Sequence, residues 1–158
     1  MHVKNDILRH FLASIAYHFT KAVKDAPDNY PELDIGGGVR TPKMIVRHIS
    51  GVLTYAHSFY KHYDSTKLDV RPWKEEVKRF YVTISKLDKS ILEKCPSGVS
   101  MEQILQGPLS DTMAHIGQLL ILRRMAGSPV PSENFIYADI RKGVLGPDQP
   151  KPVAPDEV

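Results

Sequence analysis

The stretch TPKMIVRHISGVLTYAHSFY, residues 41–60, carries the clearest helical signature in the chain. Thr41 is a favourable N-cap, and Pro42 stands at the first helical position, where its missing N–H costs nothing. The apolar residues recur at three- and four-residue intervals, as on the buried face of an amphipathic helix: Ile45, Ile49, Val52, Leu53, Ala56, Phe59 and Tyr60. His48 falls within this apolar stripe. The sequence therefore predicts a helix that places one imidazole on its core-facing side.

Two further helices flank this one in the sequence. The first has an apolar stripe that ends at Val23, before the proline-rich turn residues 26–34. The other begins near Pro72 and ends at the CPSG turn, residues 95–98. The three glycines at 36–38 follow no strand and lack the lysine of a phosphate-binding loop, so they predict a flexible turn.

The last helical stretch has two parts. Ser100 and Gln103 form a capping-box pattern at the start of a short helix. Gly107 and Pro108 are expected to reset the chain before a long helix from about Leu109 to Ala126, which Gly127 closes. The segment NFIYADI, residues 134–140, is briefly extended in this interpretation and could fold over a cavity mouth.

These elements predict an all-α fold, a four-helix bundle of the antiparallel type. The bundle is assigned to residues 1–140. Residues 141–158 are rich in proline and are predicted to form an extended or partly disordered C-terminal tail.

Composition narrows the functional classes. The net charge of +3 comes from 21 basic and 18 acidic residues without a basic run, so no nucleic-acid partner is expected. The one cysteine, Cys95, can form neither an internal disulfide nor a CxxC zinc pair. No stretch approaches the roughly 18 unbroken apolar residues of a membrane helix. A cytoplasmic protein without a membrane partner is the prediction.

Asp111 and His115 are four residues apart in the last helix, so their side chains lie one turn apart on one face. Two ligand-type residues at this spacing can hold one metal ion. If this helix neighbours the helix 42–60, His48 supplies a third donor, and open positions remain for water or substrate. Alternatively, Asp111 only complements the helix dipole in the first turn after Pro108, and the histidines are structural.

Three more side chains are candidates around such a site. Gln118 lies one turn beyond His115 and could orient a ligand or a bound water, although a packing or helix-contact role fits the sequence equally well. Tyr55 could reach the cavity from the helix 42–60, although a core position is the plainer interpretation. His18 is the reserve ligand if Asp111 proves structural. The remaining candidates are arginines expected to be solvated or paired: Arg40, Arg123 and Arg124.

The segments GVRTPKMIVRHISGVLTYA (38–56) and LSDTMAHIGQLLILRRMAGSPV (109–130) resemble the DinB/YfiT-like superfamily. The similarity extends from the first helix to about Ile140. It implies a four-helix bundle that binds nickel or zinc through three histidines, and a homodimer. His48 matches the first of these histidines and His115 the last, whereas Asp111 stands where the family usually has the middle one.

The leading functional hypothesis is a metal-dependent enzyme of the DinB-like type. The resemblance implies hydrolase or thiol-transferase chemistry on a small-molecule substrate, with nickel or zinc as the divalent transition metal and iron or manganese as alternatives. A second hypothesis is a non-catalytic, ligand- or metal-binding bundle that serves as a stress-associated interaction module. A third is a member whose site has lost its metal, with Asp111 as the mark of that loss.

Overall fold

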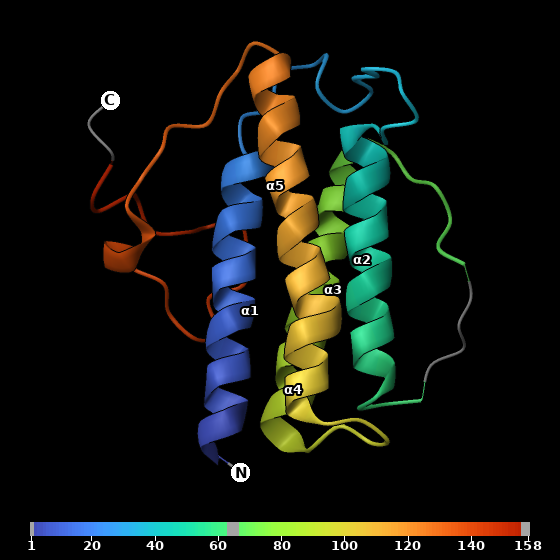
Figure 1. Ribbon diagram of the computed structural model, residues 1–158, viewed down its shortest axis with the longest axis vertical. Helices are drawn as coiled ribbons and strands as arrows, with labels where there is room; N and C mark the ends of the chain where they lie inside the picture. Colours follow the sequence, from blue (N-terminus) through green and yellow to red (C-terminus); the bar gives the residue numbers. More distant parts are fainter. Residues whose placement is uncertain (1, 63–66, 156–158) are drawn as a thin grey trace.

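A computed structural model describes residues 2–62 and 67–155 of the chain (Figure 1). Its long helices are α1 (His2–Val23), α2 (Pro42–Ser58), α3 (Trp73–Glu93) and α5 (Ser110–Met125). Shorter elements are α4 (Met101–Ile104), the π-helix η1 (Leu105–Leu109) and the 3-10 helix η2 (Phe135–Tyr137). Within the described ranges there is no strand, only an isolated bridge between Glu133 and Pro155. The predicted all-helical architecture is confirmed.

The predicted starts of two helices are confirmed at the level of their caps. The Thr41 hydroxyl accepts a hydrogen bond from the Met44 N–H at 3.4 Å, with Pro42 as the first residue of α2. Ser100 and Gln103 form the reciprocal capping box that opens α4. Each cap satisfies backbone N–H groups that have no partner within the helix, which fixes where the helix begins.

The order of helix directions differs from the antiparallel type expected from the sequence. In Figure 1, α1 and α5 run in one direction, whereas α2 and α3 run in the other. After α2 the chain returns to the end of the bundle where α2 begins, and there Trp73 at the start of α3 packs edge-on against Tyr30. The packed neighbours α2 and α3 are therefore parallel. The longer connection between them allows this arrangement, which a short turn would not.

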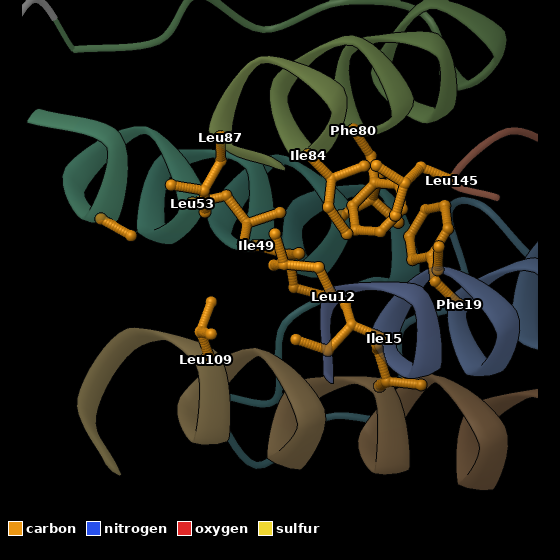
Figure 2. Packing of buried hydrophobic residues seen from close by; sticks show 14 of the residues in the cluster. Leu12, Ile15, Phe19, Ile49, Leu53, Phe80, Ile84, Leu87, Leu109 and Leu145 are labelled. Carbon is orange, nitrogen blue, oxygen red and sulfur yellow. The ribbon is translucent and has the colours of Figure 1, made fainter. Parts of the chain in front are cut away.

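The core lies between the four long helices and is formed by aliphatic and aromatic side chains (Figure 2). Phe19 of α1 stacks on Phe80 of α3 with ring centroids 3.5 Å apart. Leu145, from the C-terminal segment, is 5% exposed and joins the same core. Packing against the bundle thus continues past the predicted boundary at residue 140.

The sequence predicts that Gly107 and Pro108 interrupt the helix, but the structure shows no such interruption. The π-helix Leu105–Leu109 joins α4 to α5, so one helical run extends from Met101 to Met125 (Figure 1). Proline lacks the N–H that an α-helix needs in its interior, and a π-turn is a common way to accommodate such an interruption. Asp111 therefore lies inside a continuous run, where the dipole of a free helix start explains its carboxylate less well.

A buried histidine between α2 and α3 predicts that acid destabilises the fold. His57 is 4% exposed, and its Nε2 lies 2.8 Å from the Ser90 hydroxyl. Burial lowers the pKa of His57 below 6.5, and Lys61, Lys86 and Lys94 add to the effect. As the pH falls, the unfolded chain therefore protonates His57 at a higher pH than the folded chain does. The stabilising contribution of neutral His57 is complete above about pH 6.5 and is lost as the pH falls below this value.

We expect the urea midpoint of the wild type to fall between pH 7 and pH 5. The pKa values of His18 and His48 are also lowered by burial, so part of the fall belongs to them. A His57→Gln variant keeps a hydrogen-bonding group beside Ser90 but cannot titrate, so its midpoint should fall less over the same interval. An equal fall in both proteins would contradict this role for His57.

Candidate metal centre

Neighbouring helices of opposite direction bring the three predicted ligands together. His48 comes from α2, whereas Asp111 and His115 come from one face of α5. One donor atom of each residue lies within 4.8 Å of the other two. The imidazole rings of His48 and His115 are nearly perpendicular, with centroids 4.5 Å apart, and His115 Nε2 lies 3.5 Å from Asp111 Oδ1. Spacing on one helix and contact between two helices thus combine in one cluster.

The cluster lies at the surface of the bundle rather than in its centre. His48 and His115 are partly buried, whereas the Asp111 side chain is 50% exposed. An ion about 2.0–2.2 Å from each donor requires the donors to lie within about 4.4 Å of one another, so modest side-chain rotations are enough. Two imidazoles and one carboxylate fit a divalent transition metal. Because the ligands approach from the protein side, the solvent side stays open to water or substrate.

Gln118 forms a hydrogen bond with the His115 imidazole on the side away from Asp111. Gln118 Oε1 lies 2.9 Å from His115 Nδ1. Because an amide oxygen can only accept, the Nδ1–H group donates this hydrogen bond. The lone pair of this imidazole is then on Nε2, the nitrogen that faces Asp111. Such outer partners fix the tautomer and the ring plane of ligating histidines. Gln118 thus occupies the position expected of it from the sequence.

The local electrostatics keep His48 in the form that binds metals. Burial lowers the pKa of His48, and the charge of Arg40 and the neighbouring His115 lower it further, while Asp111 opposes them. At neutral pH the His48 imidazole is therefore neutral and has a free lone pair.

Tyr55 does not lie in the core, which corrects the plainer sequence interpretation. Its side chain is exposed, and its ring meets Phe59 edge-on at 5.0 Å. It lines a groove of about 320 Å³ together with His48, Gly51 and Leu68, so it borders the cluster without joining it. Gly51 was not predicted from the sequence as a site residue, although a glycine inside a helix, one turn beyond His48, often has a packing or functional reason.

His18 lies apart from the three ligands. Its ring packs against Phe135 with centroids 4.1 Å apart, and it lines a different pocket, between α1, α5 and residues 130–135. The segment 134–140 packs on the α1 side of the molecule and forms the helix η2, so it is neither extended throughout nor a cover for the metal cluster (Figure 1). The interpretation of this segment as a cover was wrong because helical periodicity does not fix the path of an irregular segment.

The comparisons with known proteins do not assign the chain to a family. No protein-family model, curated protein or solved structure matches it. The resemblance to the DinB/YfiT-like superfamily therefore stays a prediction. Among the helices of the described residues, none combines the length and apolar character required to span a membrane.

Proposed function

We propose that this chain is a metal-dependent enzyme of the DinB-like type, in which His48, Asp111 and His115 hold one divalent transition ion. Nickel or zinc is the proposed metal, with iron or manganese as alternatives. The observation that carries the proposal is the convergence of three donor atoms, from two helices, within 4.8 Å of one another. The hydrogen bond from His115 to Gln118 supports it, because that bond leaves the correct nitrogen available.

The proposed reaction class is hydrolysis or transfer to a thiol. A bound divalent ion supplies Lewis acidity that lowers the pKa of a water molecule or a substrate thiol. His48 and His115 position the ion at the edge of the bundle, and Asp111 offsets part of its charge. No serine or cysteine is among the described residues that line the groove beside His48, so the proposed nucleophile comes from solvent or substrate.

A non-catalytic bundle is the second candidate, and one contact favours it. The 3.5 Å separation of His115 Nε2 and Asp111 Oδ1 is also that of an ion pair that needs no metal. In that case the cluster is structural, or it is a site that has lost its metal. Activity that depends on added metal separates the two candidates.

We expect metal-loaded protein to catalyse a reaction that metal-free protein does not. The assays are hydrolysis of p-nitrophenyl acetate and conjugation of small thiols with monobromobimane, with zinc-loaded, nickel-loaded and chelator-treated wild type. At least one rate should return on metal addition and stay at background in His48→Ala. Equal rates in loaded, metal-free and variant proteins would favour the non-catalytic candidate.

A further inference from the structure

The arginines divide into those with bonded partners and those without. Partners are carboxylates or backbone carbonyls for Arg9, Arg71, Arg79, Arg123 and Arg141. Within residues 2–62 and 67–155, no hydrogen bond or ion pair joins Arg40, Arg47 or Arg124 to another side chain. Arg47 lines the groove that contains His48, and Arg40 lines a second groove that contains Gln118, the hydrogen-bond partner of His115. Two guanidinium groups without a side-chain partner among the described residues therefore line the two grooves.

The second groove is the larger of the two and has mainly apolar walls. It has a volume of about 470 Å³ and lies between the loop before α2 and the outer face of α5. Ile35 and Val39 line the loop side, and Ile121 and Leu122 line the α5 side. Gln118 lines the same groove while it accepts the hydrogen bond from His115. A molecule lying in this groove would therefore reach the neighbourhood of the metal ligands.

Arg40 is the charged residue among those that line the apolar groove. It is exposed, it lines the groove, and its positive charge acts on His48. A guanidinium without a protein partner is well suited to bind a carboxylate or a phosphate through two parallel hydrogen bonds. Exposed apolar side chains such as Ile121, which is 62% exposed, gain from contact with an apolar ligand. The groove thus offers complementary surfaces for both parts of an amphipathic anion.

We propose that the substrate is an amphipathic anion, whose apolar part lies between residues 35–39 and α5 and whose carboxylate or phosphate binds Arg40. This inference rests on the proposed function, since it places the substrate beside the metal cluster. It names a recognition residue that lies outside the ligand set. Arg40 binds the anionic group, and the apolar walls of the groove contact the apolar part of the substrate.

The test uses metal-free wild type and three probes of equal chain length: octanoate, octyl phosphate and the neutral octanamide. Binding is followed by NMR chemical shifts of the Val39, Ile121 and Leu122 methyl groups. Because charge-assisted, bidentate hydrogen bonds are stronger than those of a neutral amide, we expect at least one anion to bind about tenfold or more tightly than octanamide. The tighter of the two anions identifies the carboxylate or the phosphate as the preferred group.

Arg40→Met should remove the preference for the anion while it leaves octanamide binding unchanged. Arg124→Met is the matched control, because Arg124 also lacks a partner within the described ranges but lines the pocket on the α1 side. It should bind the probes like wild type. The inference is overturned if wild type binds all three probes equally or none of them, or if Arg40→Met behaves like wild type. Equal losses in both variants would also overturn it.

Zinc uptake of the same proteins is measured in parallel. Arg40→Met should still bind one zinc ion per chain, because Arg40 is not one of the three ligands, although the loss of its charge beside His48 can change the affinity. Normal zinc uptake without selective binding of an anion would overturn the inference and leave the proposed function in place. Selective binding of an anion without zinc uptake would overturn the proposed function but keep Arg40 as an anion-binding residue.

Discussion

Replacing His115 with alanine is expected to weaken zinc binding at least about 100-fold relative to wild type. The loss of an outer hydrogen-bond partner of a ligand typically weakens metal binding 10- to 100-fold, and the loss of the ligand itself should cost more. His115 is also the residue through which the other two are linked, since its ring meets His48 and its Nε2 faces Asp111. The measurement is a competition titration with a chromophoric chelator at neutral pH.

Gln118→Leu provides a graded comparison for this prediction. It removes the acceptor of the His115 Nδ1–H without touching a ligand, so zinc binding should weaken less than in His115→Ala, by about 10- to 100-fold. His10→Ala is the control for a histidine on the exposed side of α1 and should bind zinc like wild type. If His115→Ala bound zinc as tightly as wild type, the assignment of this ligand would be wrong.

The second large effect is on stability, and it comes from Arg123. Replacing Arg123 with alanine is expected to lower the free energy of unfolding by about 2–4 kcal/mol, because a buried carbonyl that loses its donor costs about 1–3 kcal/mol and the removed side chain leaves a cavity. Arg123 is 4% exposed, donates to the carbonyls of Ala22 and Lys24, and also bonds Ser128. Its guanidinium lies 5.5 Å from the centre of the Tyr30 ring. The alanine variant leaves the buried carbonyl of Ala22 without this donor and removes the bonds to Lys24 and Ser128.

The neighbouring Arg124 is the matched control for the stability measurement. It is exposed and has no bonded partner among the described residues, so Arg124→Ala should change the free energy of unfolding by no more than about 0.5 kcal/mol. Urea unfolding followed by circular dichroism measures both variants. Equal midpoints for the two alanine variants would contradict the proposed role of Arg123 as the tie between the ends of α1 and α5.

The starts of α2 and α4 were predictable because their signals are local. Thr41 with Pro42, and Ser100 with Gln103, satisfy backbone groups within a few residues, so sequence patterns alone indicate them. The π-turn at Pro108 was not predictable in the same way. A proline inside an apolar pattern can break a helix or be absorbed by a wider turn, and packing of the whole run decides which occurs.

The cluster of His48, Asp111 and His115 was predictable in part. The four-residue spacing of Asp111 and His115 fixes their common face, since it follows from helix geometry alone. The approach of His48 depends on which helices are neighbours, and periodicity shows only which face is buried. For the same reason, the sequence could not predict that α2 and α3 are parallel neighbours. Nor could it predict that the Tyr55 side chain is exposed.

The most direct test of the metal centre is a zinc titration of metal-free wild type beside a variant with alanine at positions 48, 111 and 115. Isothermal titration calorimetry at pH 7 should show one saturable site per chain in wild type and none in the triple variant. Absence of saturable uptake by wild type, or identical uptake by both proteins, would show that these three side chains do not form a metal site.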